Sequence, residues 1–224
     1  MSKSTSKRTL QSLTEGKTLT ATFKKFWKNE YIQTAIMLAL MVAIVFGFWY
    51  ASQLALGTQN PMLAVVTGSM CTVQGGQCDG WTHPFEHTLH IGDLIVIQGV
   101  NSAKINDDYP DSDIIVFHKP INPEELIVHR VVAKEERDGK IYFRTKGDGN
   151  GINKWPEEPE TAEYDPWVVP EELVVGRVVF RIPWVGHITL FMHNSIGLPI
   201  ILLLIILIII VEFVVPVLKG KGNV

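Results

Sequence analysis

Two long apolar runs divide this chain, and they constrain its fold more than any other feature. The first run lies within residues 29–56 and the second covers residues 197–218, and the stretch between them is polar. An α-helix rises about 1.5 Å per residue, so about 20 residues cross a hydrocarbon core of about 30 Å. The sequence therefore predicts two transmembrane helices that flank a domain in water.

The first run could instead be the core of a cleaved secretory signal, with Ala51 near the cut. The apolar core of such a signal spans only about 7–15 residues, and this run is longer. Trp27 and Trp49 flank it, as expected for side chains at the two membrane interfaces. We therefore interpret it as a retained membrane anchor.

Charge is distributed unevenly along the chain. Residues 1–28, a Ser-, Thr- and Lys-rich tail, contain seven Lys and Arg against one Glu, and residues 219–224 contain two Lys. The stretch between the apolar runs contains eleven Lys and Arg against twenty Asp and Glu. Because basic flanks stay in the cytoplasm, we expect both chain ends there and the middle domain outside the cell membrane. No basic patch is large enough to indicate nucleic acid as a partner.

The middle of the chain has the pattern of β structure. A turn at residues 137–140 is typical of a hairpin, and the stretch at 57–187 predicts a mainly β, small β-barrel-like domain. Residues 188–196 would follow it at the membrane surface. Short runs rich in Val and Ile have strand length and no helical period, and they are Met62–Val66, Leu94–Ile97, Ile114–Phe117, Leu126–Ala133, Lys140–Thr145 and Leu173–Phe180.

Three groups of residues in this domain could carry chemistry. Ser69 follows a glycine in a turn after the first strand, where its hydroxyl could act as a nucleophile beside backbone N–H groups. His129 lies within a β-branched strand and has the side chain best suited to act as a base near neutral pH. Asp148 and Asp165 lie in turns beyond the next strand. Taken singly, the serine is better explained as an ordinary turn residue and the histidine as a half-buried strand residue. The glycine-rich turn at Asp148 lacks the ligand spacing of an EF-hand calcium loop.

Taken together, these residues resemble a known family. The order Ser, His, Asp on successive β elements resembles the type I signal peptidases, in their archaeal and endoplasmic-reticulum branch. That branch has a Gly-Ser-Met box, a His-Arg-Val box, and a Lys-Gly-Asp box followed by a second Asp. The matching residues are Gly68-Ser69-Met70, His129-Arg130-Val131, Lys146-Gly147-Asp148 and Asp165-Pro166-Trp167.

The resemblance covers about residues 61–180 and implies a membrane-bound serine endopeptidase that removes signal peptides from exported pre-proteins. It implies that Ser69 is the nucleophile, that His129 is the general base, that Asp165 orients the histidine and that Asp148 is a second important acid. No metal or cofactor is expected. Membrane lipid is an expected partner, and association with the protein translocation machinery would fit this role.

An insertion at residues 71–88 departs from the family pattern. It contains both cysteines of the chain, Cys71 and Cys78, together with His83 and His87, and His90 follows it. Outside the membrane the two cysteines could form a disulfide. Free thiols and a metal site are the alternatives, although the spacing matches no strong metal signature. The insertion follows Ser69 so closely that we expect it to wall the substrate groove.

An acidic stretch at residues 153–164 is the second departure, because it separates Asp165 from Asp148 by more than the family spacing. Glu163, Glu160 or Asp148 could therefore orient His129 instead. Asp165 remains the first choice, since its Asp-Pro-Trp sequence is the better match.

Two other functions compete with the Ser/His peptidase. In the first, Lys146 would be the base of a Ser/Lys membrane protease, which requires burial to lower the pKa of the lysine. In the second, the chain would be a non-catalytic membrane subunit that binds exported chains. The complete set of nucleophile, base and acid weighs against the second.

Overall fold

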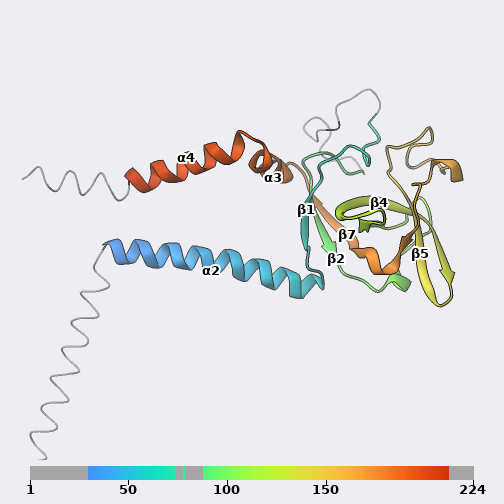
Figure 1. Cartoon of the computed structure of the whole chain (residues 1–224), viewed down its shortest axis with the longest axis horizontal. Helices are drawn as coiled ribbons and strands as arrows, with labels where there is room; N and C mark the ends of the chain where they lie inside the picture. Colours follow the sequence, from blue (N-terminus) through green and yellow to red (C-terminus); the bar gives the residue numbers. More distant parts are fainter. Residues whose placement is uncertain (1–29, 74–77, 79–87, 212–224) are drawn as a thin grey trace, which may run out of the picture. The chain divides into compact units, whose positions relative to one another are not determined.

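The computed structural model describes residues 30–73, 78 and 88–211, and the chain divides into two units at residues 52 and 53. The predicted tails at 1–28 and 219–224, and most of the insertion at 71–88, lie outside the described residues. Helix α2 (Glu30–Leu56) is drawn in blue in Figure 1. Its segment Ile32–Leu56 has a mean hydropathy of 2.2 and none of it is buried within the protein. The prediction of an apolar N-terminal membrane helix is confirmed.

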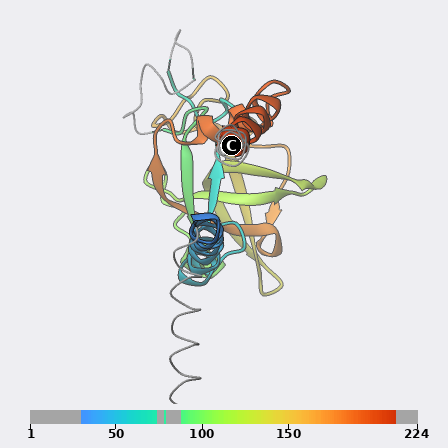
Figure 2. The same ribbon diagram turned by 90° about the vertical axis from the view of Figure 1, so that its left-hand side faces the viewer.

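The second unit contains a seven-stranded antiparallel sheet with the strand order β1-β2-β7-β3-β4-β5-β6 (Figures 1 and 2). All six predicted strands form, and β6 is a short addition that the sequence pattern did not predict. Three single turns of 3-10 helix, η1 (Ser102–Lys104), η2 (Thr161–Glu163) and η3 (Glu171–Leu173), lie between strands. The strands are β1 (Met62–Ala64), β2 (Leu94–Gln98), β3 (Ile114–Lys119), β4 (Asn122–Arg137), β5 (Lys140–Lys146), β6 (Val169–Pro170) and β7 (Val174–Ile182).

The predicted hairpin joins β4 to β5. Arg137 pairs with Lys140 across a two-residue turn, and both turn residues have positive φ, 53° at Asp138 and 75° at Gly139. An Asp-Gly pair suits this turn because both residues tolerate the left-handed region better than other types. The pairing of β4 with β5 begins only at Arg130, so the first half of β4 has no strand on that edge.

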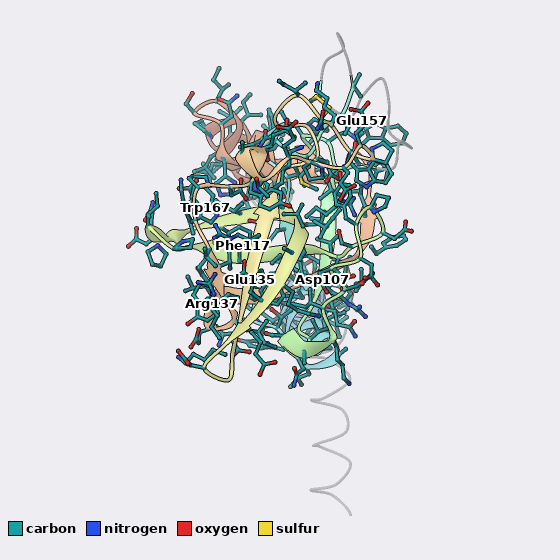
Figure 3. All side chains as sticks on the ribbon, turned by 90° about the vertical axis from the view of Figure 1, so that its right-hand side faces the viewer. Asp107, Phe117, Glu135, Arg137, Glu157 and Trp167 are labelled. Atoms are coloured by element: carbon teal, nitrogen blue, oxygen red, sulfur yellow. A yellow bond between two sulfur atoms is a disulfide. The ribbon has the colours of Figure 1, made fainter. Side chains whose placement is uncertain are left out.

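Alternation along the strands divides the core into two clusters. On β3, Val116 packs into one cluster, whereas Ile115 and Phe117 pack into the other, and all three are fully buried. Phe117 is labelled in Figure 3. On β4, Val128 joins the first cluster and Val131 the second. Successive side chains of a strand point to opposite faces. His129 therefore lies on the Val131 face of β4, and Arg130 lies on the other.

In the described part of the chain, two helices follow the sheet. Helix α3 (Gly186–His193) contacts β1, and it is followed by α4 (Gly197–Ile209) after a bend of 94°. An added Cβ at Gly186 would lie 2.5 Å from the Asp93 carbonyl oxygen, so this approach needs glycine. Within the described residues, α2 alone is long and apolar enough to span a membrane by itself, and α3 and α4 reach that length only together. The predicted span at 197–218 continues past the described residues, so the structure shows its apolar first part.

Candidate active site

Ser69 lies in an irregular turn that follows β1. The Cys71 N–H donates to the Gly68 carbonyl at 3.0 Å and closes the turn around Ser69. The Ser69 carbonyl in turn accepts a hydrogen bond from the Gly149 N–H at 2.9 Å. Since no strand ladder fixes residues 65–73, contacts to distant parts of the chain hold the serine in place.

His129 lies between Ser69 and Asp165. Its Nε2 atom is 3.1 Å from the Ser69 Oγ, and its Nδ1 atom is 2.6 Å from the Asp165 Oδ2. In the tautomer protonated on Nδ1, the imidazole donates to the carboxylate and accepts the serine hydroxyl proton at Nε2. His129 is only 6% exposed. The structure thus joins three predicted site residues in one continuous chain of hydrogen bonds.

Thr145 belongs to the same network, and the sequence interpretation gave its side chain no role. It lies on β5, is completely buried, and donates its hydroxyl to the Asp165 Oδ2 at 2.6 Å. Its carbonyl accepts the Asp165 N–H at 2.9 Å. The one signal in the sequence was the predicted β4–β5 hairpin, which places Thr145 opposite Val131, two residues from His129.

The acidic stretch before Asp165 folds into a loop that is organised by Glu163. The Glu163 carboxylate accepts the backbone N–H groups of Asn153, Ile152 and Glu160. These hydrogen bonds, of which the one from Asn153 is the strongest influence, hold the pKa of Glu163 below its usual range. Glu163 is therefore occupied by the loop backbone, and the structure places Asp165 against the imidazole.

Asp148 lies against Arg130 and forms a second, more deeply buried pair. Its two carboxylate oxygens accept the Arg130 Nε–H and Nη2–H groups at 2.8 and 2.9 Å. Burial raises the pKa of the Asp148 carboxyl, and the guanidinium acts in the opposite direction. Arg130 also donates to the Ser112 carbonyl at 2.7 Å and lies over the ring of Trp155. Arg130 thus orients the Asp148 carboxylate.

Lys146, the alternative base, has a different partner. Its amine donates to the Asn153 carbonyl, and burial lowers the pKa of the lysine. Side chains alternate along β5, so Thr145 faces Asp165 while the neighbouring Lys146 faces the 153 loop.

A cavity of about 490 Å³ opens beside the serine and the imidazole. Residues 63–67, 69 and 70 line one side and residues 125–129 line the other, with Lys119 and Trp167 also at the wall. Among the described residues, β1 pairs with β2 alone and β4 has no β5 partner before Arg130. In this part of the chain, two strand edges without a neighbouring strand therefore border the cavity.

The two cysteines of the insertion form a disulfide, Cys71–Cys78. This confirms the first of the three alternatives considered for them. Both histidines at 83 and 87, which the metal alternative required, lie outside the described residues.

The sequence and these contacts can be set beside known proteins. No protein-family model matches the chain. The chain is 28% identical over 172 residues to the human signal peptidase complex catalytic subunit SEC11C, which covers 76% of this chain and 77% of the human protein. The mouse SEC11C is 27% identical over the same length, and the Dictyostelium discoideum subunit sec11 is 25% identical over 176 residues, 77% of this chain and 83% of that protein. The chain is homologous to the catalytic subunits of the signal peptidase complex, and it is a membrane-anchored serine peptidase of the signal peptidase type.

Proposed function

We propose that this protein removes N-terminal signal peptides from exported pre-proteins, with Ser69 as the nucleophile and His129 as the general base. The observation that supports this best is the unbroken hydrogen-bond chain from the Ser69 hydroxyl through the imidazole to Asp165. Because this chain ends beside a cavity bordered by two free strand edges, an extended peptide can reach the hydroxyl.

In the proposed mechanism the Ser69 Oγ attacks the carbonyl carbon of the scissile peptide bond. His129 takes the hydroxyl proton during the attack and later gives it to the departing amine. Water then hydrolyses the acyl-enzyme in the same way. Asp165 holds the imidazole in the useful tautomer and stabilises its charged form. Base catalysis of this kind contributes about 10²–10⁴-fold to a rate.

The negative oxygen of the tetrahedral intermediate needs hydrogen-bond donors. We assign the backbone N–H of Ser69 to this role, by analogy with the family. Losing such a donor typically lowers kcat by about 10²–10³-fold. The hydrogen bond from the Cys71 N–H to the Gly68 carbonyl supports this assignment, because that carbonyl and the Ser69 N–H belong to the same peptide plane.

The substrate would bind as an extended strand between β1 and the first half of β4. Unpaired backbone groups at such edges recognise a peptide through main-chain hydrogen bonds, and pockets for alternate side chains add specificity. Small residues near the cut, as in an A-x-A-like site, fit this mode. Residues of β1 and β4 share the cavity although three strands separate them in the sheet. This supports the β-barrel-like curvature of the domain.

The same proposal gives the protein two spans, with both ends in the cytoplasm and the catalytic domain outside. The apolar helix α4, together with residues up to 218, would form the second span, and residues 188–196 would lie at the interface. Phe191 and Ile196 in this segment are exposed apolar side chains, which suits contact with lipid. A disulfide two residues beyond Ser69 supports an oxidising location outside the cytoplasm.

The relatives are named as subunits of a signal peptidase complex. We extend this to the chain: its partners are signal-bearing pre-proteins, membrane lipid and companion subunits near the translocation machinery.

Cleavage of a signal-bearing precursor in detergent tests the proposed activity. We expect the purified wild-type protein to release a mature product whose new N-terminus follows small residues at the end of the signal. The Ser69→Ala variant should release none. A Ser69→Ala variant that still cuts at the same bond would overturn the serine mechanism. A wild-type protein that binds the precursor and leaves it intact would favour the non-catalytic subunit.

A further inference from the structure

The disulfide Cys71–Cys78 begins at the turn that carries Ser69. Cys71 is the last residue of this turn, and its side chain is almost completely buried. The Ser69 turn has no strand or helix of its own. The covalent crosslink at the end of the Ser69 turn therefore restrains a segment that is not restrained by regular secondary structure.

The other end of the disulfide is anchored to the turn before β2. The Cys78 carbonyl accepts the Ile91 N–H at 2.8 Å, and the next residue, Gly92, donates its N–H to the Val65 carbonyl at 2.9 Å. The same short turn thus holds both Cys78 and the chain that leads into the nucleophile. Cys78 also packs on the turn itself, since its Cβ lies 3.4 Å from where a Cβ on Gly68 would be.

The opposite side of the Ser69 turn meets the loop at Gly149. The Gly149 N–H binds the Ser69 carbonyl, and an added Cβ at Gly149 would lie only 2.0 Å from the Cys71 carbonyl oxygen. The turn is therefore held by this loop as well as by Cys78, and Met70 at its centre is buried in the core. Releasing Cys78 would remove one of the supports that set the distance from the Ser69 Oγ to the His129 Nε2.

We propose that the Cys71–Cys78 disulfide is a positioning element for Ser69. The proposal rests on the proposed role of Ser69 as the nucleophile. The crosslink fixes the serine hydroxyl within hydrogen-bond reach of His129, and its loss lowers the rate of attack more than it weakens substrate binding. A displacement of about 1 Å in such a site can lower a rate by about 10²-fold. We expect a decrease in kcat of about 10-fold or more, with KM changed much less.

The test compares the full-length protein in detergent before and after reduction. Dithiothreitol transfers two electrons and two protons to the disulfide, which gives two thiols and cyclic oxidised dithiothreitol. The chain contains only two cysteines, so the reagent has no other target in it. The readouts are kcat and KM on a signal-bearing precursor, and the rate at which a fluorophosphonate probe labels Ser69. Both rates should fall on reduction and recover after reoxidation with oxidised glutathione.

Two variants serve as controls. The double variant Cys71→Ser/Cys78→Ser should match the reduced wild-type protein and should not respond to dithiothreitol. The Thr72→Ala variant changes the same segment but keeps the crosslink, and it should retain wild-type kcat. Unchanged kcat and labelling in the reduced protein would overturn the proposal. Loss of the circular dichroism spectrum at the assay temperature would also overturn it, because the crosslink would then act on global stability.

The oxidised wild-type protein separates this proposal from the proposed function. If it cleaves the precursor whereas Ser69→Ala does not, the function stands whatever reduction does. If the probe labels Ser69 but the protein does not cleave the precursor, the proposed substrate is wrong. The effect of reduction on the labelling rate then still decides the role of the disulfide.

Discussion

His129 and Arg130 are neighbours on β4, and each forms a short contact with an aspartate, yet the two pairs differ in what they can do. The His129–Asp165 pair continues to the Ser69 hydroxyl at the edge of a cavity. The Arg130–Asp148 pair ends in buried backbone and an aromatic ring. An imidazole can release and take up a proton near neutral pH, whereas a guanidinium stays protonated. We propose that the first pair moves a proton and that the second fixes the loop that follows β5.

Apart from the loss of Ser69 or His129 itself, the largest decrease in kcat should come from Asp165→Asn, which removes the carboxylate and keeps the side-chain shape. The amide cannot hold the imidazole in the tautomer that accepts the serine proton, and the equivalent change in a serine protease triad lowers kcat by about 10⁴-fold. Cleavage of the precursor measures this. Thermal unfolding should change little, and a variant that loses stability but keeps kcat would reverse the roles that we assign to the two pairs.

For Arg130→Met we expect a large loss of thermal stability, in contrast to Asp165→Asn, which should mainly lower kcat. This change leaves the Asp148 carboxylate buried without its partner, and breaking a buried ion pair typically destabilises a protein by about 3–5 kcal/mol. Thermal unfolding in detergent measures the loss. The double variant Arg130→Met/Asp148→Leu should recover part of it, because no unpaired charge remains. A double variant as unstable as the sum of both single variants would show that the pair itself contributes little.

The positions of six strands and the hairpin were predictable from the sequence, because β-branched runs and an Asp-Gly turn are local signals, whereas the order of the strands in the sheet was not predicted. The opposite faces of His129 and Arg130 were also predictable, since they follow from strand geometry alone. The short strand β6 was not predictable, since two residues carry no period. Its position depends on the pairing of Val169 with Phe143.

The partners of the candidate site residues were harder to predict. The sequence offered four acids for His129, and only the folded loop shows that Glu163 binds the backbone at Ile152 and Asn153 instead. Thr145 was missed for a similar reason, because a buried threonine in a strand has no pattern of its own. Contacts of this kind depend on where a long loop returns to the sheet.

The Thr145 hydroxyl provides a further test of the His129–Asp165 pair. Thr145→Val keeps the shape of the side chain but removes the hydroxyl that donates to Asp165. A hydrogen bond to a charged group contributes about 1.5–3 kcal/mol, so we expect kcat to fall about 10-fold and the pH dependence of kcat to change. Thr145→Ser retains the hydroxyl and should keep most of the activity. Equal kcat in the two variants would exclude a role for the hydroxyl.

The smallest predicted effect is on thermal stability, through the loop at Glu163, and it depends on pH. The pKa of Glu163 is lowered in the folded protein by backbone hydrogen bonds, above all the one from Asn153. Its contribution to stability is therefore present above the usual carboxyl pKa of about 4.3 and is lost as the pH falls through the lowered value. Glu163→Gln should show a slightly lower Tm than the wild-type protein at pH 7. The difference should narrow under acid, and a difference that widened there would contradict this sign.

The central claim is that His129, and not Lys146, activates Ser69. The most direct measurement is kcat for precursor cleavage by His129→Ala and Lys146→Met, assayed beside the wild-type protein. We predict that His129→Ala cuts no detectable precursor. Lys146→Met loses its hydrogen bond to the 153 loop and a positive charge near Glu163, Asp148 and Asp165. It should stay within about 10-fold of the wild-type rate. Cleavage by His129→Ala together with an inactive Lys146→Met would contradict the account.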